Sequence, residues 1–144
     1  MQRKLLFLLG ALVLIFVAIQ LVPVERSNPP VVADFDGPPE VKTVLKESCY
    51  DCHSHEVRWP GYSRVAPVSW LVAHDVKEAR EHLNFSAWGT YEANKQTKMA
   101  EEMWEEVEEG EMPLGKYLLL HRDARLTDED MAILQRWAKA EAEN

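Results

Sequence analysis

The sequence predicts an all-helical protein, in which one membrane-spanning helix precedes a small helical domain. Three observations predict this fold class. An apolar run near the N-terminus is long enough to cross a bilayer, several later segments carry apolar residues at helical spacing, and no long stretch alternates apolar and polar residues as a strand would. The chain has 144 residues, 47% hydrophobic and 28% charged, which fits a single folded domain and excludes a disordered composition.

The apolar run covers residues 5–24, and Gln20 is its only strongly polar side chain. Arg3 and Lys4 precede it and should stay in the cytoplasm. We therefore expect residues 1–24 to be an uncleaved, single-pass anchor in the inner membrane of a bacterium, with the rest of the chain in the periplasm. The alternative is a cleaved signal peptide with a cleavage site at residues 31–33, but its apolar region would normally be only ~7–15 residues long. Either way, the rest of the chain is exported.

Residues 25–39 contain four prolines and show no helical periodicity. We expect them to form an extended, Pro-rich linker that tethers the domain at residues 40–144 to the membrane. The domain opens with Val41, Val44 and Leu45 at i, i+3 and i+4, a spacing that predicts a short helix running into the cysteines.

A second helix is expected after a loop at residues 58–67, because Pro67 suits the first turn of a helix. Its apolar side chains would be Trp70, Leu71, Ala73, Val76 and Leu83.

A third helix, at about residues 91–109, is strongly amphipathic, and Gly110 is a plausible terminator. Glutamates line one side, and the other side carries Met99, Met103, Trp104 and Val107.

The last helix has the clearest start. Thr127 is a predicted N-cap and Asp130 follows three residues later, which is a variant of the capping box. The buried stripe of this helix should be Met131, Leu134 and Trp137.

The only two cysteines stand in the sequence Cys49-Tyr50-Asp51-Cys52-His53, which is the C-x-x-C-H attachment signature of haem c. The spacing lets two thiols reach the two vinyl groups on one edge of a porphyrin. The next residue then lies beneath the iron, where a neutral imidazole can bind it. We therefore expect one covalently attached haem c, bound by Cys49 and Cys52, with His53 as the proximal iron ligand.

Three alternatives compete for the cysteines. A disulfide suits an exported protein, although it would close only a very small loop. A thioredoxin-like dithiol needs a β-α-β context that the chain lacks, and a four-ligand zinc site would need further ligands where no second cysteine pair exists.

Met112 is the predicted distal iron ligand. It stands before Pro113, which can hold the local chain extended, and it follows His53 by 59 residues, which leaves room for the chain to wrap around a porphyrin. Met/His ligation is a usual way to raise the potential of a haem for electron transfer. His74, in an apolar helix, is the alternative ligand.

The remaining candidates are weaker. Met99, Met103 and Met131 are predicted to pack in the core, and His55 is too close to His53 to reach the opposite face of a porphyrin. His82 is expected on the surface, and His121 either bonds a loop or is exposed.

Two stretches carry a resemblance to a known family: "CYDCHSHEVRWPGYSRVAPVSWLVAHDVKEAREHLNFSAW" and "GEMPLGKYLLLHRDARLTDEDMAILQRW". Together they resemble the bacterial haem-binding domain family of cytochrome-c-like proteins, over about residues 40–140. The resemblance implies a cytochrome-c-like helical domain around one haem, with Cys49, Cys52, His53 and Met112 in the roles given above. Ala79 departs from the glycine that the family often has before the arginine.

We expect a membrane-anchored electron carrier, not an enzyme, that exchanges one electron at a time with unidentified redox proteins at the membrane or in the periplasm. A haem-based enzyme or a gas or redox sensor, with an open or displaceable sixth iron site, is the alternative. Nucleic acid is not an expected partner, because the formal charge is −8. Aromatic side chains are expected to wall the haem pocket, namely Trp59, Tyr62, Trp70 and Trp88.

Overall fold

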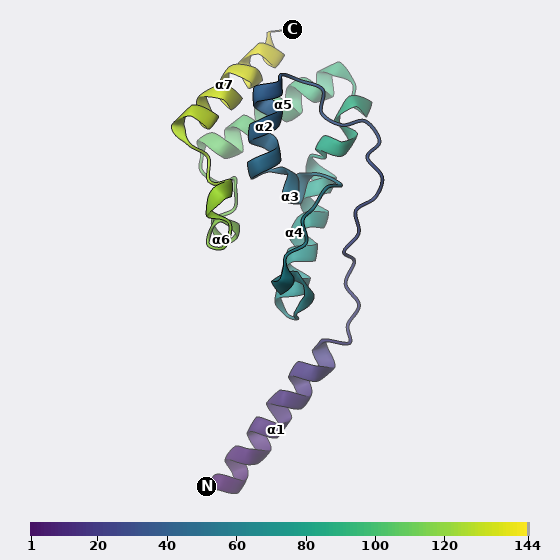
Figure 1. Cartoon of the computed structure of the whole chain (residues 1–144), viewed down its shortest axis with the longest axis vertical. Coiled ribbons are helices and arrows are strands. Elements are labelled where there is room, and N and C mark those ends of the chain that lie inside the picture. Colours follow the sequence, from purple (N-terminus) through teal and green to yellow (C-terminus); the bar gives the residue numbers. More distant parts are fainter. Residues whose placement is uncertain (144) are drawn as a thin grey trace.

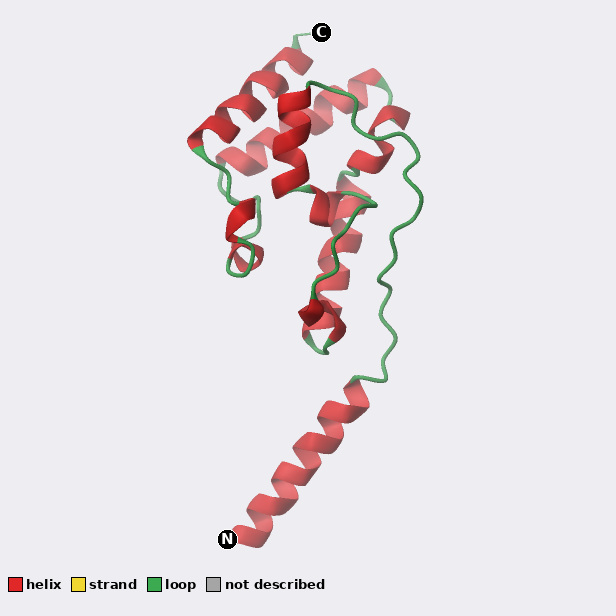
Figure 2. Ribbon diagram, viewed as in Figure 1, coloured by secondary structure: helices red, strands yellow, loops and turns green. Residues whose placement is uncertain are grey.

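The computed structural model describes residues 1–143, and within them the chain forms helices and loops without strands (Figure 2). The all-helical fold class is therefore confirmed. The α-helices are α1 (Gln2–Ile19), α2 (Pro39–Ser48), α3 (Tyr50–His53), α4 (Val68–His82), α5 (Ala93–Glu108), α6 (Gly115–Leu118) and α7 (Asp128–Ala142). Three short 3₁₀ helices lie between them: η1 (Gly61–Arg64), η2 (Phe85–Thr90) and η3 (Arg122–Ala124).

Helix α1 extends away from the folded domain (Figure 1). None of its residues is buried, and by length and composition it could cross a membrane. A signal sequence passes the same test. An extended segment then runs back up the side of the domain to α2.

The core lies between α2, α5 and α7, where α5 and α7 pack along each other and α2 packs on α7. The predicted apolar face of α2 is confirmed, and that of α7 is confirmed except at Met131, which is only partly buried. Val41, Val44 and Leu45 are buried in α2, and Leu134 and Trp137 are buried in α7.

The ends of α5 and α7 follow their predicted signals. The Thr127 side chain accepts a hydrogen bond from the Asp130 amide, and the Asp130 carboxylate accepts one from the Thr127 amide, so the capping box is complete. Gly110 has a φ of 79°, which a residue without a Cβ adopts without strain, and it ends α5 as predicted.

The segment before α2 is extended as predicted, but its last part is not a free tether. Phe35 is only 1% exposed, and its ring meets Phe85, Trp88 and Trp137 edge-on. A Cβ at Gly37 would collide with the Phe35 ring, so the chain needs glycine to fold over it. The core therefore begins before residue 40, because the linker contributes one of its central rings.

The predicted apolar face of α4 is wrong at its first turn. Val76 and Leu83 are buried, but Trp70 and Leu71 are exposed. The reason is that the N-terminal half of α4 projects from the domain toward α1 (Figure 1), where its helical neighbour is the short η1, which leaves Trp70 and Leu71 exposed. Helical spacing identifies an apolar stripe but cannot tell how much of its length meets the core.

Candidate functional site

A cavity of about 930 Å³ lies between α3, α4, α5 and the segment that leads into α6. This volume is near the upper end of the range for small-molecule sites, about 300–1,000 Å³. Its wall includes the predicted site residues Cys49, Cys52, His53 and Met112, which the fold thus brings together from distant parts of the sequence. Their roles toward a cofactor stay predictions.

Cys49 and Cys52 stand on one wall of the cavity, at the start and inside of the single-turn helix α3. The amides of Cys52 and His53 both donate to the Cys49 carbonyl, at 3.1 and 2.9 Å, which closes this turn. Both thiols are free, so the disulfide alternative does not describe this structure.

Burial and the neighbouring sulfur raise the pKa of the Cys49 thiol to about 12. Burial and the Asp51 charge raise the pKa of Cys52 to about 11. Both thiols are therefore protonated at neutral pH. Dithiol redox enzymes depend on a lowered thiol pKa, so the environment opposes a thioredoxin-like role.

The His53 ring is held by a backbone carbonyl. Its Nδ1 lies 3.0 Å from the carbonyl oxygen of Leu83, and because a carbonyl can only accept, Nδ1 must carry the proton. The Nε2 lone pair is then free. Burial lowers the pKa of His53, which favours the neutral imidazole. A neutral ring with a fixed tautomer is the form in which histidine binds a metal.

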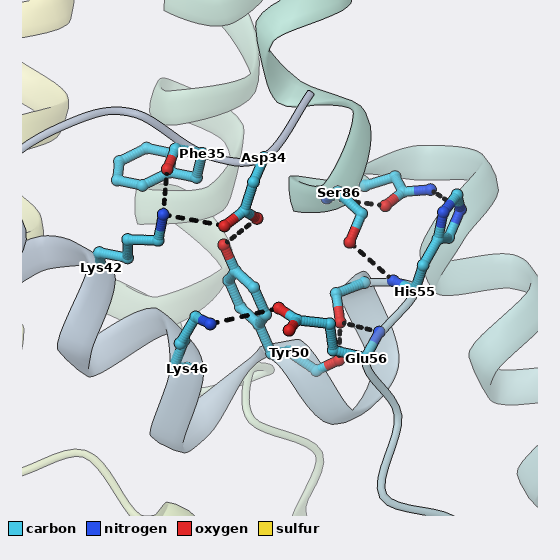
Figure 3. Close-up of polar contacts among 10 residues, drawn as sticks. Asp34, Phe35, Lys42, Lys46, Tyr50, His55, Glu56 and Ser86 are labelled. Carbon is cyan, nitrogen blue, oxygen red and sulfur yellow. Dashed lines mark hydrogen bonds and ion pairs between the residues drawn. The ribbon is translucent and has the colours of Figure 1, made fainter. Parts of the chain in front are cut away.

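Tyr50 fixes α3 to the core. Its ring stacks on Phe85 at 5.3 Å, and its hydroxyl donates to the Asp34 carboxylate at 2.8 Å. Asp34 also pairs with Lys42 of α2 at 2.8 Å, so the linker, α2 and α3 are joined at one point (Figure 3). Burial opposes ionisation of Asp34, but the hydrogen bonds from Lys42 and Tyr50 hold the pKa of that carboxyl below its usual value.

The chain after His53 is held as firmly. Fully buried Ser54 donates to the Tyr50 carbonyl at 2.7 Å, and the His55 amide donates to the Ser86 hydroxyl at 2.9 Å (Figure 3). Arg80 of α4 donates to the Ser54 carbonyl at 2.8 Å. Residues on both sides of His53 are thus fixed by buried and part-buried hydrogen bonds.

Asp51, between the cysteines, links α3 to α6. Its carboxylate accepts a hydrogen bond from the Tyr117 hydroxyl at 2.9 Å and pairs with Arg58 at 3.0 Å. Burial raises the pKa of Asp51, but the hydrogen bonds from Arg58 and Tyr117 outweigh this and hold it below the usual value. Tyr117 also lines the cavity, so this contact fixes the edge of the site near Met112.

Met112 reaches the cavity because of the way in which α5 ends. After the turn at Gly110, the amides of Glu111 and Met112 both donate to the Glu106 carbonyl, at 2.9 and 3.1 Å. This directs Met112 back over the end of α5, where it lies partly buried. His74, the alternative ligand, is exposed and does not line the cavity.

The sequence reasoning missed several residues of the site. Met99 and Met103 do pack against the core, but both also line the cavity, and so does exposed His82. The two methionines are four residues apart on α5, so one face of the helix serves both purposes. The spacing of four residues could have shown from the sequence that both methionines lie on the same face of α5.

The expected aromatic wall is wrong. None of its members lines the cavity: Trp59, Tyr62, Trp70 and Trp88. Trp88 instead packs in the core, beside Phe35 and Trp137. The aromatic side chains of the cavity wall are Phe85 and Tyr117, which stand in the two stretches that carry the family resemblance.

The donor set fits a flat, metal-containing macrocycle. Two protonated thiols lie along one edge of the cavity, a neutral imidazole offers Nε2, and methionine sulfurs line the same cavity. A zinc site fits less well, because residues 1–143 contain no cluster of three or more His, Cys, Asp or Glu side chains that could hold a metal ion.

Comparison with known proteins agrees with a metal-containing macrocycle and identifies it as haem. A family model described as "Haem-binding domain" matches residues 14–140, a range that includes every residue of the site. No curated protein matches the chain. No solved structure matches it either.

Proposed function

Because the chain belongs to this haem-binding domain family and is thus a haem protein, we propose that it is a membrane-anchored c-type cytochrome that transfers single electrons outside the cytoplasmic membrane. The observation that carries the proposal is the meeting of Cys49, Cys52, His53 and Met112 at one cavity. When bound, haem supplies an iron that accepts and releases one electron.

The chain's own residues divide the remaining work. Cys49 and Cys52 would hold the group through thioether bonds, each formed when an S–H adds across a vinyl C=C. His53 would bind the iron through Nε2, with Leu83 keeping the ring in the required tautomer. Met112 would offer its sulfur from the α5–α6 segment.

Two observations favour a carrier over an enzyme or sensor. The cavity wall includes Met99, Met103 and Met112, and thioether donors suit a six-coordinate iron. A peroxidase would need a base and a cation beside the iron. His74 is exposed, and Arg80 is committed to hydrogen bonds with the Ser54 and Ser27 carbonyls.

The anchor and its orientation are part of the proposal. Helix α1 is apolar enough to cross a membrane, and Arg3 and Lys4 stand at its N-terminal end. By the positive-inside rule, this charge pattern favours an N-terminus in the cytoplasm and a haem domain in the periplasm.

An acidic face of α5 supplies a docking surface for a basic redox protein. Its glutamates are Glu101, Glu102, Glu105, Glu106, Glu108 and Glu109, and three of them (Glu102, Glu105 and Glu106) also border the cavity. Opposite charge on a partner would steer it toward the haem.

The test is to produce the full chain together with haem-c maturation machinery. Haem that stays with the protein through denaturing electrophoresis would support covalent attachment, and a weak absorption band at the red end of the ferric spectrum would support methionine ligation. If haem is bound but lost on denaturation, the c-type assignment is wrong. Rapid binding of carbon monoxide by the unmodified ferrous protein would favour the enzyme or sensor.

A further inference from the structure

The large apolar side chains that the domain leaves exposed are not scattered over its surface. Among the described residues after Val32, all of them fall in two short segments, residues 65–71 and 119–120. We call these side chains the apolar patch: Val65, Val68, Trp70, Leu71, Leu119 and Leu120. An exposed group of this kind marks a surface that meets another apolar body.

The two segments of the patch adjoin the same element, η1. Residues 65–71 follow η1 directly and form the start of α4. Residues 119–120 precede His121, whose Nε2 lies 2.6 Å from the hydroxyl oxygen of Tyr62 in η1. Leu119 is 75% exposed and Leu120 68% exposed, so this bond does not cover them.

The patch also lies beside the end of α1. The side chain of Gln20, the residue just after α1, makes two hydrogen bonds to the backbone of Ala66. It accepts one from the Ala66 amide at 2.9 Å and donates one to the Ala66 carbonyl at 3.2 Å. Arg26 donates to the Ser63 carbonyl at 3.2 Å. Ala66 lies between Val65 and Val68, so these bonds place the patch level with the C-terminal end of α1.

We propose that the apolar patch rests in the membrane that α1 crosses, so that the haem domain lies on the lipid surface in a fixed orientation. The inference rests on the proposed anchor. Where α1 leaves the hydrocarbon, the Gln20–Ala66 bonds bring the tip of α4 to the same depth. Exposed Leu and Val side chains would enter the interface, and Trp70 has the amphipathic ring favoured at headgroup level.

Charge agrees with this orientation. Arg26, Arg64 and Arg122 stand beside the patch, where they can meet anionic headgroups. The acidic helix α5 lies in the part of the domain away from α1 (Figure 1). The domain would thus turn its basic, apolar end to the lipid and its acidic face to the periplasm.

The test uses photocrosslinking to lipid. The full, haem-loaded chain is placed in vesicles of phosphatidylcholine and phosphatidylglycerol, with p-benzoylphenylalanine at one position in each variant. Leu71 and Leu120 probe the patch, Leu12 probes α1, and exposed Lys139 of α7 is the matched surface control. Val68 and Leu119 are the substitutes if a patch variant fails to accumulate with haem.

We expect lipid adducts at Leu12, Leu71 and Leu120, with several-fold more adduct at both patch positions than at Lys139. If Leu12 labels lipid but either patch position labels no more than Lys139, the docking is overturned while the anchor stands. If Leu12 does not label lipid, the anchor fails, and the inference fails with it.

Discussion

The two walls of the cavity are built differently. The wall that carries His53 is fixed by contacts from the linker, α2, α4 and η2, and it includes the buried side chains of Tyr50, Ser54 and Ser86. The wall that carries Met112 depends on one turn after α5, on the hydrogen bond from Tyr117 to Asp51 and on a part-exposed ion pair between Lys116 and Asp75. A site built in this way would hold His53, the proposed proximal ligand, rigidly and leave Met112, the proposed distal ligand, more freedom.

The difference has a consequence for ligation. Fixed donors keep a metal in place, whereas a ligand on a loosely held segment can be displaced or exchanged. Met99 and Met103 line the same cavity and could replace Met112 as the proposed ligand.

The largest effect is expected from Cys49→Ala combined with Cys52→Ala. The double variant should carry no covalent haem, because no other cysteine exists in the chain. Haem staining after denaturing electrophoresis measures this, and Met112→Ala, which keeps both thiols, is the control. Covalent haem in the double variant would exclude the attachment proposed here.

Met112→Ala should lower the reduction potential and open the iron to carbon monoxide, because thioether ligation favours ferrous iron. Axial ligands account for about 0.8 V of variation among haems, so the fall should be easy to measure by redox titration. Met131→Ala is the matched control, because Met131 packs against the core and does not line the cavity. It should mainly cost stability, by roughly 2–5 kcal/mol, through a cavity in the core.

His74→Ala tests the rival ligand and should change neither the potential nor carbon monoxide binding. If it changes both while Met112→Ala changes neither, the distal ligand is His74. A six-coordinate spectrum in Met112→Ala would mean that another residue binds the iron. If an additional substitution of Met99 or Met103 then removes that spectrum, the substituted methionine had replaced Met112.

Gly37→Ala should lower the free energy of unfolding by disturbing the packing behind the wall that carries His53, although Gly37 does not line the cavity. The added methyl group meets the Phe35 ring, which packs on Phe85 behind Tyr50. Overpacking of this kind costs about 1–3 kcal/mol. Denaturant unfolding measures the loss, and Gly61→Ala is the control because a Cβ there meets open space. Equal effects of the two changes would mean that the Phe35 contact is not the cause.

The smallest effect is expected from Tyr117→Phe, which removes one hydrogen bond to Asp51 and keeps the ring. The change should cost about 0.5–1.5 kcal/mol of unfolding free energy. It should also speed carbon monoxide binding to the ferrous protein, since the Met112 segment loses its tie to α3. Tyr62→Phe, which removes the bond to His121 outside the cavity, should leave carbon monoxide binding unchanged.

The parts of the fold that the sequence predicted are those with local signals. The capping box at Thr127, the terminator at Gly110 and the apolar stripes of α2 and α7 each depend on residues within a few positions of one another. The C-x-x-C-H motif is local in the same sense, so the cysteine and histidine positions could be read directly.

The errors concern contacts between distant residues. The residues next to Phe35 in the sequence do not indicate that a proline-rich linker places an aromatic ring in the core. The residues next to Trp70 do not indicate that the start of α4 lies outside the core. The link between Tyr117 and Asp51 joins residues 66 positions apart. Such contacts depend on the path of the whole chain, which periodicity and spacing do not specify.

The docked linker also sets how far the haem domain can travel. Fourteen residues, 21–34, separate Gln20 from Phe35, and at about 3.4 Å per residue a free strand of this length would reach roughly 50 Å. Arg26, Asn28 and Ala33 of this linker donate hydrogen bonds to the domain, and these bonds hold the linker against the side of the domain. With the proposed anchor, a domain held in this way would search for partners by moving in the plane of the membrane, in two dimensions. It would meet proteins embedded in the same bilayer far more often than proteins diffusing above it.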